Sequence, residues 1–433
     1  MHFYVEPGGK LTGSIRVPGD KSMSHRVIML GSIAEGKTHV SGFLEGEDAL
    51  ATLSAFRNMG VTISEPQSGR LTIEGVGLVG LQAPQGIMDV GNSGTSIRLM
   101  AGLLAGQTFS SVLTGDESLL RRPMARVITP LSQMGALIHS REGCPPLEIT
   151  GGRPLRGLHY ELPVASAQVK SSVLLAGLYA EGTTSVVEPA PTRDHTERML
   201  RGFGYDVQAS SGSISLEGGG TLRGTTVDIP ADISSATFFI VGASIAEGSD
   251  LVLEHVGVNP TRDGVIRILE AMGADITMSN ERDVGGEPVA DLRVRSAPLR
   301  GIEIPVEEVP LAIDELPAIL IAAACAEGVT VLRGAEELRV KESDRIASMA
   351  EGLTQLGIIN TVHPDGIAVT GGKMSGGVIA THHDHRIAMS FAMAGLCASD
   401  RIKISDCAHV ATSFPGFAAL ANQAGLQLEV ADT

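Results

Sequence analysis

Cysteine and aromatic residues are scarce in this 433-residue sequence, which contains 4 Cys, 10 Phe, 4 Tyr and no Trp. The cysteines are scattered without a CxxC pair, so neither a disulfide framework nor a zinc site is expected, and buried reduced thiols are the simplest interpretation. No apolar run approaches the roughly 20 residues that cross a membrane. The first residues have neither the basic nor the apolar region of a signal peptide. The sequence therefore predicts a cytoplasmic protein that does not bind membranes.

Basic residues are outnumbered, because 33 Lys and Arg stand against 49 Asp and Glu and give a net charge of −16. A protein that binds nucleic acid needs a basic face to neutralise phosphates, so this class is excluded. Apolar residues make up 43% of the chain, which excludes an acidic disordered protein. The net charge does not exclude a small phosphorylated substrate, because the local field at a binding site decides that.

A repeating unit runs through the chain, which is long enough for at least two domains. Each copy has a polar segment, an apolar helical run that stops near Ala-Glu-Gly, a strand, and a second helix that stops near Met-Gly. Glycine after a helix adopts the left-handed conformation without a Cβ penalty. The first stops are Gly36, Gly106, Gly182, Gly248, Gly328 and, in degenerate form, Asp400; the second stops are Gly60, Gly135, Gly204, Gly273, Gly357 and Gly425. Six α/β units are predicted, three in each of two domains, with a boundary within residues 226–232.

One motif is misleading. Gly31 to Thr38 reads GSIAEGKT and matches the P-loop pattern. A P-loop follows a strand and opens a helix, because its amides and the helix N-terminus hold the phosphates. Here a helical run precedes the motif and a strand follows it, so an NTPase is not predicted.

Several loop-to-helix passages carry groups that suit an anionic ligand. In GDKSMSHR, Lys21, Ser22 and Arg26 lie where a loop enters a helix. A solvated helix start with Ser22 or Ser24 as its N-cap is the alternative. In GNSGTSIR, Gly94 permits a ligand to approach the backbone closely.

Further passages extend this pattern. RRPM contains Arg122, and PTRDHTERML contains Arg193 beside Asp194 and Glu197 at capping-box spacing. ELRVKESDRIASM packs charges of both signs before a helix, which is more typical of a site than of a solvated face. THHDHRIAM contains three histidines and an aspartate, but no other cluster completes a metal site, so its Arg386 is the better candidate.

The order of the motifs carries a resemblance. From near residue 10 to near residue 420 the chain contains VPGDKSMSHR, GNSGTSIR, GDESLLRRPM, ASAQVKS, PTRDHTE, IDELP, RVKESDR, DHRIAMSF and TSFPGF. It resembles the 5-enolpyruvylshikimate-3-phosphate synthase family, and PTRDHTE, RVKESDR and DHRIAMSF are similar to the second sequence class of that family. The resemblance implies an α/β fold, a two-domain inside-out α/β barrel with six βαβαββ repeats, three per domain. Residues 1–19 with 231–433 would form one domain and residues 20–230 the other, with the active site in the cleft between them.

The implied reaction transfers the enolpyruvyl group of phosphoenolpyruvate to the 5-hydroxyl of shikimate 3-phosphate and releases phosphate, in the route to chorismate and the aromatic amino acids. The resemblance implies a monomer that uses no cofactor and no metal, with glyphosate as a possible inhibitor. Three catalytic residues are implied: Asp314 would take the hydroxyl proton and also bind shikimate 3-phosphate, Glu342 would transfer a proton at the methylene carbon, and Lys21 would contact both substrates. The other implied ligands are Ser22, Arg26, Ser166, Gln168, Arg193 and Lys341 for shikimate 3-phosphate, and Gly94, Arg122, Gln168, Arg345 and Arg386 for phosphoenolpyruvate.

Two departures and two alternatives complete the interpretation. Ala411 stands where some family members have a Lys, and Ala167 stands where many have a second Ser. The related UDP-N-acetylglucosamine enolpyruvyl transferases use a Cys in the loop that reads GDESLLRRP here, and this chain has none there. A non-catalytic anion-binding relative would keep the arginines and lose the carboxylates, whereas Asp314 and Glu342 are both present.

Overall fold

The computed structural model describes residues 1–210 and 212–432, and the chain divides into two compact units. Unit 1 comprises Met1–Pro18, Pro230–Asp283 and Pro288–Thr433, and unit 2 comprises Gly19–Ile229 and Val284–Glu287. The sequence suggested that the chain changes units after residue 19 and again after residue 230. The structure has these changes after Pro18 and after Ile229, one residue earlier in each case. The short piece Val284–Glu287 was not anticipated in unit 2, where Glu287 Oε1 lies 2.7 Å from His195 Nδ1.

Unit 2 contains three four-stranded sheets among its described residues, and each has one parallel pair followed by antiparallel neighbours. The strand orders are β14 (Thr226–Asp228), β3 (Glu35–Ser41), β5 (Leu71–Val76), β4 (Thr62–Ile63); β6 (Met88–Asp89), β7 (Ser111–Thr114), β9 (Cys144–Thr150), β8 (Leu137–Arg141); and β10 (His159–Glu161), β11 (Thr183–Val187), β13 (Ser213–Glu217), β12 (Gln208–Ser210). The α-helices are α1 (Lys21–Ile33), α2 (Glu47–Asn58), α3 (Gly94–Ala105), α4 (Ala125–Gln133), α5 (Ala167–Gly177) and α6 (His195–Gly202).

Unit 1 follows the same plan. Its sheets have the orders β16 (Asp275–Val284), β17 (Glu287–Arg295), β15 (Asp250–Gly257), β2 (Thr12–Ile15); β18 (Val329–Leu332), β20 (Gly366–Thr370), β19 (Asn360–His363); and β21 (Gly377–Ala380), β22 (Ile402–Ser405), β1 (His2–Val5), β23 (Leu428–Ala431). The α-helices are α7 (Ile233–Ile245), α8 (Gly264–Ala271), α9 (Leu316–Cys325), α10 (Arg345–Gln355), α11 (His385–Ala394) and α12 (Phe417–Ala424). Beside β18, isolated parallel bridges at Arg300 and Glu303 stand where the other described sheets have a strand.

Two kinds of helix alternate along the chain. The odd-numbered helices are largely buried on all sides, as in α9, where Leu316–Ala324 is buried throughout, and α7, where Ile233–Ser244 is buried throughout. A helix that is hydrophobic all round belongs inside a domain. The even-numbered helices are amphipathic, and α8 buries Val265, Ile268 and Leu269 as its spacing predicted.

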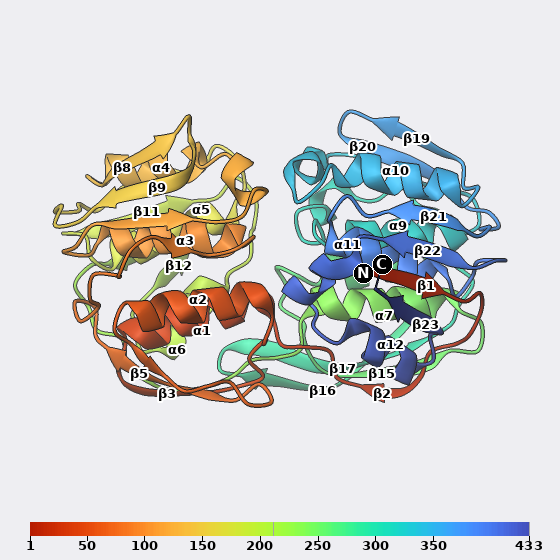
Figure 1. The fold of residues 1–433 in the computed structure, drawn as a ribbon, viewed down its shortest axis with the longest axis horizontal. Helices are drawn as coiled ribbons and strands as arrows, with labels where there is room; N and C mark the ends of the chain where they lie inside the picture. The colour runs from red at the N-terminus through yellow and green to blue at the C-terminus, as the bar shows by residue number, and fades with distance from the viewer. Residues whose placement is uncertain (211, 433) are drawn as a thin grey trace. The chain divides into compact units, whose positions relative to one another are not determined.

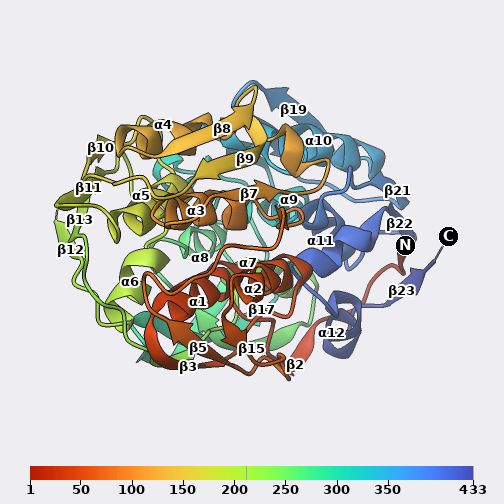
Figure 2. The ribbon, with the colours of Figure 1, turned by 60° about the vertical axis from the view of Figure 1, so that its left-hand side comes forward.

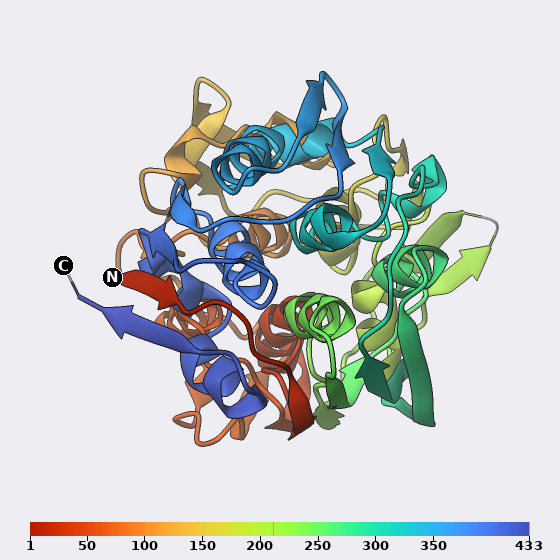
Figure 3. The same cartoon turned by 90° about the vertical axis from the view of Figure 1, so that its right-hand side faces the viewer.

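The odd-numbered helices lie inside each unit and the sheets lie outside. Figure 3 views α7, α9 and α11 of unit 1 nearly end-on (green, teal and blue), with the strands around them. Figure 2 shows β3, β8 and β11 of unit 2 outside α1 and α3, and Figure 1 labels the elements of each unit. The close approach of α3 and α5 requires glycine, because a Cβ on Gly102 would lie 2.0 Å from the carbonyl oxygen of Ser172. This is the predicted inside-out α/β architecture.

The glycine stops are confirmed with one exception. All six second stops have positive φ, from 80° at Gly357 to 121° at Gly425, and four of the first stops do as well. Gly106 is different, because its φ is −85° and the expected left-handed conformation is wrong there. A Cβ on Gly106 would lie 2.3 Å from Cγ of Tyr179, so this glycine makes room for a ring rather than for a turn.

The structure bears on two expectations from the sequence, the state of the cysteines and the lack of a membrane-spanning segment. The four cysteines are free thiols, and Cys407 is buried whereas the other three are half-buried, which corrects the expectation that all are buried. Among the described residues, none of the helices is both long enough and apolar enough to span a bilayer.

Candidate active site

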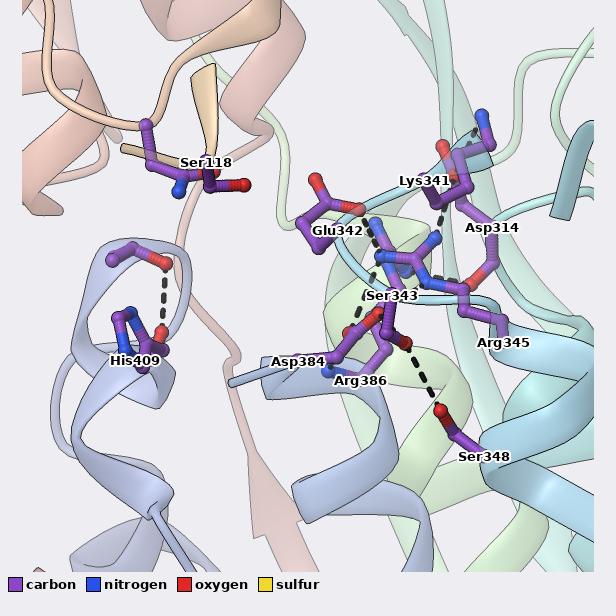
Figure 4. A network of polar contacts seen from close by, with 12 residues as sticks. Ser118, Asp314, Lys341, Glu342, Ser343, Arg345, Ser348, Asp384, Arg386 and His409 are labelled. Atoms are coloured by element: carbon purple, nitrogen blue, oxygen red, sulfur yellow. Dashed lines mark hydrogen bonds and ion pairs between the residues drawn. The ribbon is translucent and has the colours of Figure 1, made fainter. Parts of the chain in front are cut away.

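Arg345 is the centre of an ion-pair cluster in unit 1, and Figure 4 shows the carboxylates that point toward it. Its side chain is 1% exposed. Arg345 Nε lies 2.8 Å from Asp384 Oδ2, and Arg345 Nη2 lies 2.6 Å from Glu342 Oε2. Arg345 Nη1 lies 3.3 Å from Asp314 Oδ1. One planar guanidinium therefore fixes both candidate proton-transfer carboxylates.

Two further cations approach Asp314. Lys341 Nζ lies 3.5 Å from Asp314 Oδ1, and Arg386 Nη1 donates to the Asp314 carbonyl oxygen at 2.9 Å. The structure thus brings together the five site residues that the sequence assigned to this unit. They come from the residues before α9, the segment before α10 and the first turns of α10 and α11.

The electrostatics of the cluster keep its central pair ionised. Burial acts to lower the pKa of Arg345, but Asp384, Glu342 and Asp314 outweigh it and the pKa is raised. Burial acts to raise the pKa of Asp384, but Arg345 outweighs it and the pKa is lowered. A buried charge is tolerated when it is paired in this way.

Helix caps explain why these residues meet. Asp344 caps α10 by accepting from Ala347 N at 3.0 Å, and Asp384 caps α11 by accepting from Arg386 N at 2.9 Å. Each arginine then lies in the first turn of a helix, where the helix dipole disfavours a cation. The nearby carboxylates offset this cost for Arg345.

The start of α1 holds three of the predicted ligands in unit 2. The N-cap of α1 is Asp20, which accepts from Met23 N at 2.8 Å, so neither Ser22 nor Ser24 is the cap. Lys21 forms an ion pair with Asp48, whose side chain is 6% exposed. Lys21 and Ser22 are half-buried, so both stay accessible at the start of the helix.

Arg26 is held from several sides. Its Nε donates to Thr196 Oγ1 at 2.7 Å, Nη2 donates to Ser171 Oγ at 2.8 Å and Nη1 donates to the Ser22 carbonyl oxygen at 2.9 Å. Burial lowers its pKa to about 10, so Arg26 stays a cation at neutral pH. Arg26 is 3% exposed, so its guanidinium is buried against the Thr196 and Ser171 hydroxyls and does not lie on an open surface.

His25 links α1 to α2 and α3 through hydrogen bonds, and its side chain is neutral. Its Nδ1 lies 2.9 Å from Thr52 Oγ1 and 3.2 Å from Ser96 Oγ. Burial lowers its pKa well below the ordinary value, and Lys21 and Arg26 lower it further. The neutral imidazole therefore adds no third positive charge beside those two cations.

The loop before α3 gathers arginines around a glycine. A Cβ on Gly94 would lie 2.9 Å from Arg98 Nη1 and 3.0 Å from Arg122 Nη1. Arg122 Nη2 donates to Asn92 Oδ1 at 2.5 Å, and Asn92 Nδ2 donates to Asp116 Oδ2 at 2.6 Å. Two guanidiniums and the start of a helix thus meet at one point, which suits an anion.

The start of α5 carries two more predicted ligands. Ser166 caps the helix by accepting from Val169 N at 3.4 Å. The Gln168 amide is fixed at both ends, because Arg98 Nη1 donates to its Oε1 at 2.5 Å and its Nε2 donates to Thr95 Oγ1 at 3.0 Å. Arg193 lies half-buried in the segment before α6.

The expected capping box at α6 is wrong. Asp194 stands at the N-cap position but makes no capping bond, and its Oδ2 accepts from Arg198 Nε at 2.8 Å. Glu197 lies 2.6 Å from Lys170 Nζ on another helix. Glu197 therefore pairs with Lys170 on α5 and does not complete a capping box at the start of α6.

Sequence reasoning missed some residues that hold the site. Asp384 was considered for a metal and set aside, although its N-cap position two residues before Arg386 was a usable signal. Arg98 and Asn92 lay within GNSGTSIR without an assigned role, and Thr196 lay within PTRDHTE. Their partners are distant in sequence, as with Thr196 and Arg26, which are 170 residues apart.

No group of three or more His, Cys, Asp or Glu side chains in the described part of the chain is arranged to hold a metal ion. The candidate residues form two sets, one within each unit. The carboxylate set in unit 1 is Asp314, Lys341, Glu342, Arg345 and Arg386; the anion set in unit 2 is Lys21, Ser22, Arg26, Gly94, Arg122, Ser166, Gln168 and Arg193.

Comparison with known proteins identifies the family of this chain. The model of the EPSP synthase (3-phosphoshikimate 1-carboxyvinyltransferase) family matches residues 5–420. The 3-phosphoshikimate 1-carboxyvinyltransferase of Alkalilimnicola ehrlichii is 65% identical over 100% of this chain and 97% of its own length. That of Nitrosococcus oceani is 62% identical over 99% of this chain and 97% of its own length.

The solved structures agree. EPSP synthase from Acinetobacter baumannii, determined at 2.37 Å, is 59% identical, covers 100% of both chains and gives a TM-score of 0.91. A family model that spans nearly all of the chain, relatives above 60% identity and this structural match are consistent with one another. The chain therefore belongs to the family of EPSP synthases, the 3-phosphoshikimate 1-carboxyvinyltransferases.

Proposed function

We propose that this chain transfers the enolpyruvyl group of phosphoenolpyruvate to the 5-hydroxyl of shikimate 3-phosphate and releases phosphate, as a step of aromatic amino acid biosynthesis. The observation that carries the proposal is the Arg345 cluster, in which one buried guanidinium holds Glu342 and Asp314 while Lys341 approaches Asp314. Membership of the EPSP synthase family supports it.

The carboxylate set carries out the proton transfers of the proposed reaction. Glu342, in its acid form, gives a proton to the methylene carbon of phosphoenolpyruvate, and positive charge develops at C2. The 5-hydroxyl oxygen attacks C2 while Asp314 accepts its proton. Glu342, now a carboxylate, then takes a proton from the new methyl group, which restores the double bond as the C2–O bond to phosphate breaks, and the departing phosphate takes the proton held by Asp314. Two positioned acid and base groups supply rate factors of roughly 10²–10⁴.

The anion set binds the charged groups of the two substrates. We assign Arg122 and the loop at Gly94 to phosphoenolpyruvate, because two guanidiniums and a helix N-terminus meet there. Arg345 and Arg386 are assigned to the same substrate. Lys21 contacts both substrates, as does Gln168, whose amide is already fixed by Thr95 and Arg98. The assigned ligands of shikimate 3-phosphate are Lys21, Ser22, Arg26, Ser166, Gln168, Arg193, Asp314 and Lys341.

Several finer expectations belong to this proposal. The protein would act as a monomer in the cytoplasm, without a metal or an organic cofactor, and without nucleic-acid or membrane partners. Glyphosate would compete at the phosphoenolpyruvate subsite, where Gly94 leaves space beside Arg98 and Arg122.

The test is release of phosphate from phosphoenolpyruvate by the purified chain. Release is expected when shikimate 3-phosphate is added and not when UDP-N-acetylglucosamine is added in its place. Equal release with the two acceptors would overturn the assignment of the acceptor. Absence of release with shikimate 3-phosphate would leave the chain as an anion-binding relative without this activity.

A further inference from the structure

Lys170 is a buried lysine that the proposed reaction does not use. It lies on α5, two residues after Gln168 and four after Ser166, and its side chain is 1% exposed. Burying an ammonium is costly unless every donor finds a partner. The partners of Lys170 therefore indicate what the residue does.

All of those partners lie on one segment, Glu188 to Glu197, which carries Arg193. Lys170 Nζ lies 3.1 Å from Glu188 Oε2 at the start of the segment and 2.6 Å from Glu197 Oε1 at its end. It also lies 3.5 Å from the carbonyl oxygen of Thr192, the residue before Arg193. The ammonium donates hydrogen bonds to Glu188 Oε2 and to the Thr192 carbonyl oxygen, and its contact with Glu197 is an ion pair without a hydrogen bond.

The Glu188–Glu197 segment also contains an internal hydrogen bond at Glu188. The Thr192 hydroxyl donates to Glu188 Oε1, so the start of the segment and the residue before Arg193 share one carboxylate. Burial raises the pKa of Glu188, and Lys170 lowers it in part. The carboxylate therefore depends on Lys170 for much of its stabilisation as an anion.

A second cation joins the cluster from α1. Arg26 Nε donates to Thr196 Oγ1 and Arg26 Nη2 donates to Ser171 Oγ, which are the neighbours in sequence of Glu197 and Lys170. The Ser171 and Thr196 hydroxyls are 2.7 Å apart. Two cations and two carboxylates thus form one buried array with balanced charge. The contacts of Lys170 and the bond from Arg26 to Thr196 join α5 and α1 to the Arg193 segment, and the bond from Arg26 to Ser171 joins α1 to α5.

Stability alone does not explain this arrangement. Replacing a buried ion pair by packed apolar groups is often neutral or stabilising, because desolvation offsets much of the attraction. What directional bonds provide in addition is a fixed register between two elements. Here the two elements are the helix that begins at Ser166 and the segment that presents Arg193.

We propose that Lys170 is a positioning residue for the sugar-phosphate subsite: its ammonium ties both ends and the middle of Glu188–Glu197 to α5 and so sets Arg193 relative to Ser166. This inference rests on the proposed function, in which Arg193 and Ser166 bind shikimate 3-phosphate. Gln168 is held independently by Thr95 and Arg98, so the phosphoenolpyruvate side does not depend on Lys170.

The experiment compares the KM values of the two substrates. The main variant is the triple substitution Lys170→Met, Glu188→Gln, Glu197→Gln, because Lys170→Met alone would leave two buried carboxylates unpaired. The KM for shikimate 3-phosphate is expected to rise about 10- to 100-fold, the range for a displaced substrate-positioning group. The KM for phosphoenolpyruvate and kcat are expected to change less than about threefold.

A milder variant and a matched control complete the design. Glu188→Gln keeps the Lys170–Glu197 pair and is expected to give a smaller rise in the same KM; it decides the matter if the triple variant does not fold. Lys37→Met removes a lysine of the same unit whose side chain is 63% exposed, and both KM values should stay at the wild-type level. Urea unfolding of each variant separates loss of fold from loss of register.

The outcomes are distinct. Unchanged KM for shikimate 3-phosphate in folded variants, or an equal rise of both KM values, overturns the positioning role. Wild-type protein that releases no phosphate with both substrates present overturns the proposed function instead. A selective rise in the KM for shikimate 3-phosphate supports the role of Lys170, because a purely structural role would not separate the two substrates.

Discussion

The two sets of site residues occupy equivalent places in the repeat but differ in chemistry. In unit 1, three carboxylates surround Arg345, and two of them, Asp314 and Glu342, are the groups proposed to transfer protons. In unit 2, the candidate side chains are cations, hydroxyls and an amide, such as Lys21, Ser166 and Gln168. The repeat supplies helix N-termini in both units, and only in unit 1 do the candidate residues include carboxylates, Asp314 and Glu342, for the proposed proton transfers.

The tetrapeptide Pro-Thr-Arg-Asp shows the same difference on a smaller scale. It occurs at residues 191–194 and again at residues 260–263. Arg262 is 3% exposed, and its Nη2 donates to Ser234 Oγ at 2.6 Å and lies 3.1 Å from Asp232 Oδ1. Arg193 is half-buried and lies in the segment held by Lys170. Identical local sequence therefore gives a buried structural arginine in one unit and a proposed ligand in the other.

The largest expected effect tests whether the carboxylate set carries the chemistry. Glu342→Gln and Asp314→Asn keep the shape of each side chain but cannot exchange the proton. We expect kcat for phosphate release to fall about 10²- to 10⁴-fold in each. The matched control is Asp344→Asn, two residues from Glu342, because asparagine also caps a helix and kcat should change little. Near-normal turnover in either test variant would remove that residue from the mechanism.

An effect of intermediate size tests whether the anion set of unit 2 binds the charged groups of the substrates without taking part in the chemical step. Gly94→Ala places a methyl group 2.9 Å from Arg98 Nη1 and 3.0 Å from Arg122 Nη1, so both guanidiniums must shift. We expect the KM for phosphoenolpyruvate to rise about tenfold, the loss of one charged hydrogen bond, with kcat little changed. Inhibition by glyphosate should weaken more than substrate binding.

The control for that variant is Gly202→Ala on α6, where the nearest atom to the new methyl group is 3.7 Å away. Both kinetic constants should stay at the wild-type level there. A fall in kcat with unchanged KM in Gly94→Ala would mean that unit 2 takes part in the chemical step and would break the comparison.

The smallest expected effect is on how the free energy of unfolding depends on pH. One carboxylate in each unit has a shifted pKa, and the two shifts have opposite directions: lowered for Asp384 in unit 1 and raised for Glu188 in unit 2. The pKa of Asp384 is lowered from 3.8, so its stabilising contribution is present above that value and is lost as the pH falls through the folded-state pKa. The pKa of Glu188 is raised from 4.5, so stability falls as the pH rises from 4.5 through the raised value. A tenfold change in the proton affinity of a carboxylate corresponds to about 1.4 kcal/mol of folding free energy.

The measurement is the midpoint of urea unfolding between pH 3 and pH 7 for wild type, Asp384→Asn and Glu188→Gln. Asp384→Asn should flatten the acid side of the profile, and Glu188→Gln should flatten the decline above pH 4.5. The same slope in wild type and variants would show that these two groups do not govern the pH dependence.

Local rules in the sequence predicted the helix ends well. A glycine with positive φ after each even-numbered helix is a local requirement, so Gly60 and Gly357 could be identified without any tertiary information. The same kind of rule failed at Gly106, where the side chain of Tyr179 decides, and at Glu197, where Lys170 decides. Both failures come from contacts with residues far away in the chain.

The residues of the site were predicted better than the residues that hold them. The motifs contain Glu342 and Arg345 three residues apart, so their pairing could be anticipated from spacing. Asp384 lies 39 residues from Arg345, and only the packing of α10 near α11 brings them together. In the same way Thr196 and Ser171 come to Arg26 through three separate helices.

The position of β1 sets an order for synthesis of the chain. Every strand in the sheets of unit 2 lies before residue 229, so those sheets have all their strands once about half of the protein has left the ribosome. β1 lies more than 390 residues before its two neighbours, because it pairs with β22 (Ile402–Ser405) and with β23 (Leu428–Ala431). Its sheet in unit 1 can therefore be completed only after residues 428–431 have been made.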